Sequence, residues 1–124
     1  WIYILGEKIE RIDGTITFIL IIAFTGIFSN FLQYFWTGSS LFGGLSGVIY
    51  GLIGYCMILE MDSEYDRYQL PPGLYLFMIV WLLFGFIGLL ELFGFGSVAN
   101  FAHLGGLLSG VMFAMIYKNL SGRI

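Results

Sequence analysis

Long apolar stretches separated by short polar segments set the pattern of this chain. Four of them, at residues 15–35, 41–59, 73–93 and 95–117, come close to the roughly 20 residues with which a helix crosses the hydrocarbon core of a bilayer. Nearly all charged residues fall between or beyond these stretches. The pattern predicts an all-α membrane protein, a polytopic bundle with four transmembrane helices in one domain covering residues 1–124.

The composition favours the same class. Apolar residues make up 59% of the 124 residues and charged residues only 10%, and the mean hydropathy of +0.92 lies outside the usual range of soluble domains. The 18 glycines do not argue against helices, because lipid obliges the backbone of a spanning segment to satisfy its own hydrogen bonds. The single cysteine, Cys56, excludes an intrachain disulfide, and we expect it to pack as a small apolar side chain.

The basic residues predict an orientation. All five lie in segments 6–14, 60–72 and 118–124, which four spans would place on one side of the membrane. The opposite connections, residues 36–40 and 94–97, contain no Lys or Arg, so the positive-inside rule makes the first side cytoplasmic in a multi-pass cell-membrane protein. The scattered basic residues and the net charge of −3 exclude nucleic acid as a partner.

The start of the chain predicts a part of a longer protein. The first residue is Trp1 rather than Met. No charged region stands before an apolar stretch and no small-residue cleavage site follows one, so we expect no signal peptide.

The acidic residues of segment 60–72 lack the glycine and glutamate spacing of a calcium loop. No metal or cofactor is therefore expected.

Ser46, Tyr50 and His103 form the candidate chemical group. At about 1.5 Å per helical residue, Ser46 and His103 both fall roughly 7 to 12 Å below the outer surface. Tyr50 lies one turn after Ser46 on the same face, so the three side chains can share one layer. An ionisable residue within a span indicates a functional site, and a serine becomes a nucleophile only beside a base.

Glycines predict that two of the helices approach closely. The second apolar stretch carries a row of glycines along one face, Gly44, Gly47, Gly51 and Gly54. The last stretch has the small residues Gly106, Gly110 and Ala114 after His103. Small residues at this spacing let spanning helices pack backbone against backbone. Such a contact would bring His103 within reach of Ser46, although the stripes alone are more typical of helix packing without chemistry.

Other interpretations of these residues remain open. A serine in a spanning helix often bonds to its own backbone, and a lone histidine is often structural. His103 could instead relay protons in a transporter, but the sequence offers no second intramembrane acid to complete a relay. The stretch from Gly44 to Val48 is not the G-x-S-x-G nucleophile elbow, because Val48 stands where that motif has glycine.

Two motifs resemble the rhomboid family of intramembrane serine proteases, particularly the bacterial kind. The family's G-x-S-G at the start of its fourth core helix matches residues 44–47, within GGLSGVIYGLIGY. Its histidine in the sixth helix, followed by small residues at plus three and plus seven, matches His103, Gly106 and Gly110. The resemblance covers essentially the whole chain and makes it the last four helices of a six-helix core, with residues 1–6 ending the family's second helix.

The resemblance implies a Ser-His dyad that cleaves transmembrane segments of membrane proteins. Ser46 would be the nucleophile and His103 the general base and acid, with Tyr50 packed on the imidazole. Residues implied to serve oxyanion or substrate binding are Gly44, Leu45, Tyr50 and Asn100. For Asn100, helix packing without a direct role in the site is the alternative. Residues implied to pack the helices are Gly47, Gly51, Gly106 and Gly110. The family's H-x-x-x-N motif, which contributes oxyanion donors, would lie before Trp1.

The resemblance also gives the third apolar stretch a role. Its aromatic residues Phe77, Trp81 and Phe84 would correspond to the lateral gate through which a substrate helix approaches, although lipid-facing aromatics are an equally simple interpretation. Glu91 is expected at the outer interface. The alternative function from the same family is a catalytically inactive membrane protein that binds and retains client helices, and the oligomeric state is not predicted.

Overall fold

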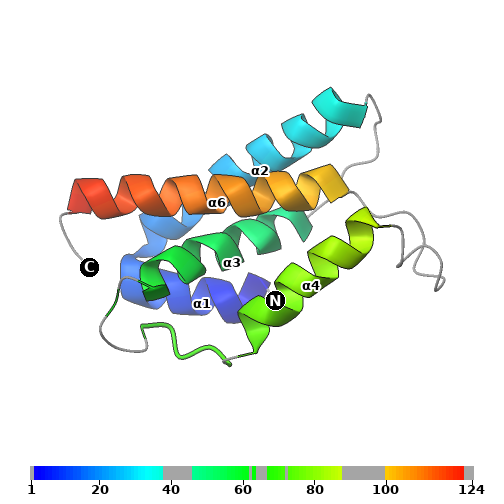
Figure 1. The fold of residues 1–124 in the computed structure, drawn as a ribbon. Helices are drawn as coiled ribbons and strands as arrows, with labels where there is room; N and C mark the ends of the chain where they lie inside the picture. Colours follow the sequence, from blue (N-terminus) through cyan, green and yellow to red (C-terminus); the bar gives the residue numbers. More distant parts are fainter. Residues whose placement is uncertain are drawn as a thin grey trace.

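The computed structural model describes residues 2–37, 46–61, 63, 67–71, 73–87 and 100–121 (Figure 1). Within these ranges every regular element is a helix. The helices are α1 (Ile2–Asp13), α2 (Thr15–Thr37), α3 (Ser46–Met61), α4 (Leu74–Phe86) and α6 (Asn100–Ser121). The predicted all-α class is confirmed.

Among the residues that the structure describes, one helix is long and apolar enough to cross a membrane. This is α2, through its window Thr15–Leu32, whereas the apolar segments Gly47–Met61 and Leu74–Phe86 are shorter than a full span. The predicted stretches 41–59, 73–93 and 95–117 extend into residues outside the described ranges. Four spanning helices therefore stay a prediction.

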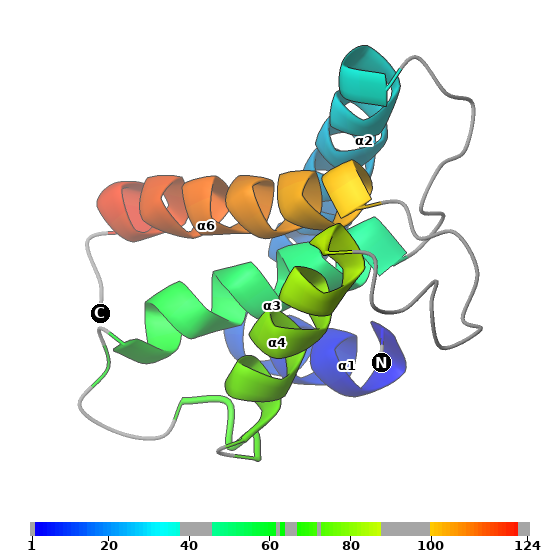
Figure 2. The same cartoon turned by 45° about the vertical axis from the view of Figure 1, so that its right-hand side comes forward.

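Helix α3 is the centre of the bundle. It contacts each of the other described helices, and in both views it lies between α6 and α1 (Figures 1 and 2). Its residues are buried almost all round, from Gly47 and Val48 to Leu59. A helix with no polar face needs apolar neighbours on every side. Helices α1, α2, α4 and α6 supply them.

Helix α1 corrects the sequence interpretation of residues 6–14 as a connecting segment. The helix continues to Asp13 because Leu5 and Ile9, one turn apart, are both fully buried against the bundle. Only Gly14 separates it from α2, with a φ of 103° that favours glycine. The connection is thus a single left-handed residue. The other described helices begin or end within a few residues of the predicted bounds.

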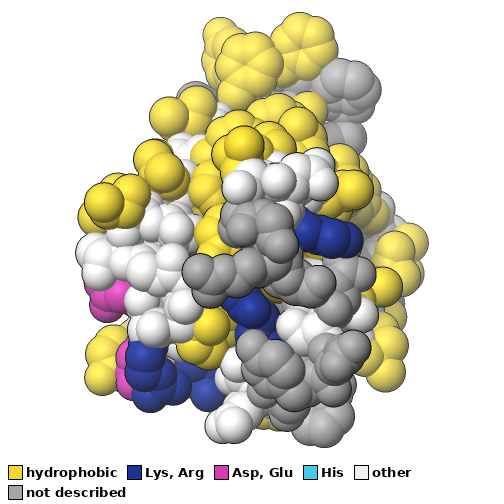
Figure 3. Space-filling model, turned by 90° about the vertical axis from the view of Figure 1, so that its left-hand side faces the viewer, with side chains coloured by type: hydrophobic (Ala, Val, Ile, Leu, Met, Phe, Trp, Pro, Cys, Tyr) yellow, Lys and Arg dark blue, Asp and Glu magenta, His cyan; other side chains and the backbone are white. Residues whose placement is uncertain are grey.

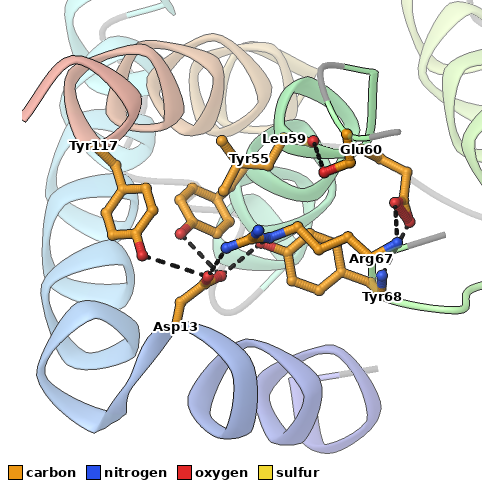
Figure 4. Close-up of polar contacts among 8 residues, drawn as sticks. Asp13, Tyr55, Leu59, Glu60, Arg67, Tyr68 and Tyr117 are labelled. Atoms are coloured by element: carbon orange, nitrogen blue, oxygen red, sulfur yellow. Dashed lines mark hydrogen bonds and ion pairs between the residues drawn. The ribbon is translucent and has the colours of Figure 1, made fainter. Parts of the chain in front are cut away.

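A buried carboxylate joins four parts of the fold at this junction (Figure 4). Asp13, at the end of α1, accepts hydrogen bonds from Tyr55 of α3 at 3.0 Å, from Tyr68, and from Tyr117 of α6 at 3.5 Å. Arg67 donates to the same carboxylate in a charged pair. The Asp13 side chain is 0% exposed and that of Arg67 11% exposed. We call these five residues the Asp13 cluster.

Glu60 extends this network into the segment before α4. Its carboxylate accepts the backbone N–H of Arg67 at 2.7 Å and that of Tyr68 at 3.0 Å. Burial, the neighbouring Tyr55 phenol and the hydrogen bond to Asp13 raise the pKa of Tyr68 well above its ordinary value. Tyr68 therefore stays a neutral donor, and the segment is fixed to the bundle at several points.

The Asp13→Ala variant tests the cluster. Removing one partner of a buried, hydrogen-bonded pair leaves an uncompensated charge, so we expect the free energy of unfolding to fall by about 3–5 kcal/mol. The matched control is Glu7→Ala on the same helix, because Glu7 pairs with Arg11 at 3.7 Å on an exposed face. Such a pair contributes about 0.5 kcal/mol or less. Detergent-induced unfolding of the full-length protein in mixed micelles measures both, and equal losses would contradict the assignment.

Candidate functional site

The candidate site lies where the first turns of α3 and α6 meet. Ser46 is the first residue of α3, and His103 is in the first turn of α6, which begins at Asn100. The two helices lie side by side along most of their lengths (Figures 1 and 2). The chain segments on either side, residues 38–45 and 88–99, are outside the described ranges.

Glycine brings the two backbones into direct contact. A Cβ atom at Gly106 would overlap the carbonyl group of Gly47 and lie only 2.8 Å from its carbon. A Cβ at Gly110 would likewise overlap the carbonyl group of Gly51, and one at Gly54 would lie 2.6 Å from the carbonyl oxygen of Leu107. Backbone atoms cannot rotate away as a side chain can. The contact therefore requires glycine on both helices.

His103 is held face to face with Tyr50 at the end of this contact. The two ring centroids are 4.9 Å apart with an interplanar angle of 26°. Both side chains are buried, at 7% exposure for His103 and 2% for Tyr50. The Tyr50 phenol donates a hydrogen bond to the main-chain oxygen of Met78 in α4 at 3.1 Å. The tyrosine thus touches the histidine with its ring and a third helix with its hydroxyl.

The structure brings together six of the residues singled out from the sequence. Besides Tyr50 and His103 these are the four glycines that face one another across the helix contact, Gly47, Gly51, Gly106 and Gly110. Ser46 and Asn100 are described as the first residues of their helices. Gly44, Leu45 and Glu91 lie outside the described residues. In the ranges that are described, no group of three or more His, Cys, Asp or Glu side chains could hold a metal ion.

The sequence interpretation missed the third partner of the glycine stripe. Thr25 of α2 packs on Gly51, whose added Cβ would lie 2.5 Å from the Thr25 methyl carbon. The Thr25 hydroxyl is satisfied within its own helix, because it donates to the carbonyl of Ile21 at 2.7 Å. Thr25 is a small polar residue in the middle of the apolar stretch 15–35, and this position was the one sign in the sequence that α2 could pack closely against another helix there. The α3 backbone is thus approached closely from two sides.

Comparison with known proteins identifies the family. The model of the Rhomboid domain matches residues 1–120, and the chain belongs to the rhomboid family. It is 35% identical over 114 residues to the rhomboid protease GlpG of Serratia proteamaculans (strain 568), covering 92% of this chain and 39% of that protein. The GlpG proteins of Yersinia pseudotuberculosis serotype I (strain IP32953) and Yersinia pestis (strain Pestoides F) match with the same identity and coverage.

The family membership confirms the resemblance seen in the motifs. Rhomboids are polytopic helical proteins of the membrane, so the chain belongs to a family of integral membrane proteins. It spans 39% of the length of the curated relatives it matches.

The Gly106→Ala variant tests the helix contact. The added Cβ meets the Gly47 carbonyl group, so the helices must separate, and we expect a loss of about 1–3 kcal/mol in the free energy of unfolding. Gly26→Ala is the matched control within a helix, since its added Cβ would lie an ordinary 3.4 Å from the Val48 side chain. Unfolding of the full-length protein in mixed micelles should separate the two variants. A Gly106→Ala protein as stable as Gly26→Ala would contradict the backbone contact.

Proposed function

We propose that this chain carries the serine–histidine dyad of an intramembrane endopeptidase that cleaves transmembrane segments of membrane proteins. The observation that carries the proposal is the His103 ring, buried and stacked on Tyr50 at the end of the α3–α6 contact. Ser46 begins α3 one residue before Gly47, which touches Gly106 of the histidine's helix. The relatives named rhomboid protease support the same activity.

The stack suits a histidine that acts as a base. Tyr50 covers one face of the imidazole, whereas both ring nitrogens lie on the ring edge. The phenol therefore fixes the plane of the ring without competing for the proton. In this arrangement Tyr50 performs the orienting task that a carboxylate performs in a catalytic triad.

The reaction would proceed by acyl transfer. The Ser46 hydroxyl attacks the peptide carbonyl while His103 takes its proton, and a tetrahedral intermediate forms. The imidazolium then gives the proton to the leaving amine, which departs and leaves an acyl-serine ester. Water, deprotonated by His103, attacks the ester, and Ser46 regains its proton. No metal or cofactor is needed for these steps.

The start of α3 suits the oxyanion. The first N–H groups of a helix have no partner within the helix and carry its positive dipole end. Ser46 begins α3, so its backbone N–H belongs to this region and can donate to the developing oxyanion. The backbone N–H of Leu45, which the family resemblance implies as a donor, is part of the same proposal. Gly44 and Asn100 complete the proposed substrate-binding group, and further donors would come from outside this chain.

The membrane placement belongs to the same proposal. Lys and Arg side chains show on the end of the molecule where α6 terminates and α1 meets α2 (Figure 3). By the positive-inside rule this end is cytoplasmic, which puts Ser46 and His103 near the opposite, extracytoplasmic surface. Four spanning helices would then contain the described apolar segments, and substrates would enter from the bilayer.

Labelling by a fluorophosphonate tests the dyad directly. We expect full-length wild-type protein in detergent to be labelled at Ser46, and Ser46→Ala and His103→Ala to lower the labelling rate by at least about 10³-fold, because neither residue acts without the other. Gel fluorescence and mass spectrometry of the adduct measure the rate and the site.

The matched control is Ser29→Ala. Ser29 is a buried serine whose hydroxyl donates to the Gly26 carbonyl of its own helix at 3.2 Å, so its loss should leave labelling within about twofold of wild type. Well-folded wild-type protein that is never labelled would contradict the peptidase and favour the client-binding relative. Retained labelling in His103→Ala would contradict the assigned base.

A further inference from the structure

Helix α2 packs against the bundle with only one side. It is long and apolar enough to cross a membrane, yet only 17% of its window Thr15–Leu32 is buried inside the bundle. The buried side carries Ile21, Thr25 and Ser29. The second half of the helix projects beyond the other helices in both views (Figures 1 and 2). The opposite side of α2 is therefore open to a partner.

The open side of α2 follows a regular repeat. Its four large side chains are between 52% and 75% exposed, and Ala23 between them is exposed as well. The positions alternate at spacings of four and three residues, which is the 3.5-residue repeat with which two helices pack side chains into holes over several turns. We call this row the α2 seam, and it consists of Ile16, Leu20, Ala23, Ile27, Asn30 and Tyr34.

Asn30 distinguishes the seam from a surface that only meets lipid. The residue is partly exposed, and its Oδ1 is buried with no hydrogen-bond partner among the residues that the structure describes. It lies within the apolar window of α2, where lipid tails offer neither donor nor acceptor. An unpaired carboxamide is costly there, and Asn side chains of membrane helices hydrogen-bond across to neighbouring helices. The seam thus calls for a protein partner.

Symmetry makes a second copy of this chain the partner that fits Asn30. Two copies inserted in the same orientation and related by a two-fold axis along the membrane normal bring their α2 helices together in parallel, residue against the same residue. A carboxamide both donates and accepts, so it is complementary to itself, and rotation about its last torsion presents either end. Ala23, one heptad before Asn30, leaves room for a close approach of the two backbones.

The size of the seam also suits a dimer. From Ile16 to Tyr34 it extends about 27 Å at 1.5 Å per residue, close to the thickness of the hydrocarbon core. Burial of roughly 60–120 Å² at each seam position in both copies comes to about 1,000 Å², the area of a specific interface of modest affinity.

We propose that two copies of this protein associate in the membrane through the α2 seam, with their Asn30 carboxamides hydrogen-bonded across the two-fold axis. Thr25, which packs on Gly51 of α3, lies on the other side of α2. The dimer therefore leaves the packing around the α3–α6 contact in place. It goes beyond the proposed peptidase activity and does not depend on it.

Disulfide crosslinking in native membranes tests the seam. Full-length protein without Cys56 or any other native cysteine receives one new cysteine, by Ala23→Cys or Ile27→Cys. The matched control is Leu108→Cys, because Leu108 is 47% exposed and lies about as far from the start of α6 as Ile27 does from the end of α2. Non-reducing gels measure dimer formation after oxidation. We expect it to be at least about fivefold faster at the seam positions, since a disulfide requires adjacent Cβ atoms.

The Asn30→Leu variant tests the hydrogen bond. It keeps the size of the side chain but removes its polar atoms, and we expect the dissociation constant of the dimer to rise at least about threefold. Energy transfer between labelled full-length copies in liposomes measures this constant. Ser29→Ala is the control on the same helix, since the Ser29 hydroxyl bonds within α2, and it should stay within about twofold of wild type.

Three results would overturn the dimer. One is crosslinking at the seam no faster than at Leu108→Cys, and another is a dissociation constant that Asn30→Leu leaves unchanged. The third is a wild type that stays monomeric in liposomes. In that case a loss of unfolding free energy in Asn30→Leu beyond that of Ser29→Ala would assign the seam to another helix of the same protein, and equal stability would assign it to lipid.

Discussion

The direct contact between the backbones of α3 and α6 is the constraint on which the site depends. Gly106 faces the Gly47 carbonyl and Gly110 faces the Gly51 carbonyl, and any side chain at Gly106 or Gly110 would force the helices apart. Lipid offers no hydrophobic drive for helices to associate, so close van der Waals packing between small residues must supply the attraction. The contact sets the register in which Tyr50 meets His103. Chemistry and packing therefore share the same few positions.

Local pattern was enough to predict much of this arrangement. Apolar runs of the length of a span gave α2, α3, α4 and α6, because lipid-facing and buried positions alike require apolar side chains. The glycine spacing of three and four marked the faces that meet, since those offsets share one side of a helix. The all-α class and the family are confirmed. The number of spans, the orientation and the roles of Ser46 and His103 stay predictions.

Contacts distant along the chain could not be predicted from the sequence. The Asp13 carboxylate beside Gly14 has the pattern of a loop residue, yet its partners Arg67 and Tyr117 lie 54 and 104 residues away. The hydrogen bond from Tyr50 to Met78 spans 28 residues and depends on where α4 crosses α3. Such pairs are set by tertiary packing, and no periodicity of apolar residues in the sequence predicts them. Residues 1–6 were expected to end a helix, but its continuation to Asp13 was missed for a related reason, because the buried apolar side chains Leu5 and Ile9 stand among charged ones.

A structure of the full-length protein after reaction with a phosphonate tests the central claim most directly. The account predicts a covalent bond from the Ser46 Oγ to phosphorus, with one His103 ring nitrogen about 2.6–3.2 Å from the Ser46 Oγ or a phosphonate oxygen and the Tyr50 ring still stacked on the imidazole. An adduct on another residue, or a His103 ring that stays beyond hydrogen-bonding distance of the bound group, would contradict it.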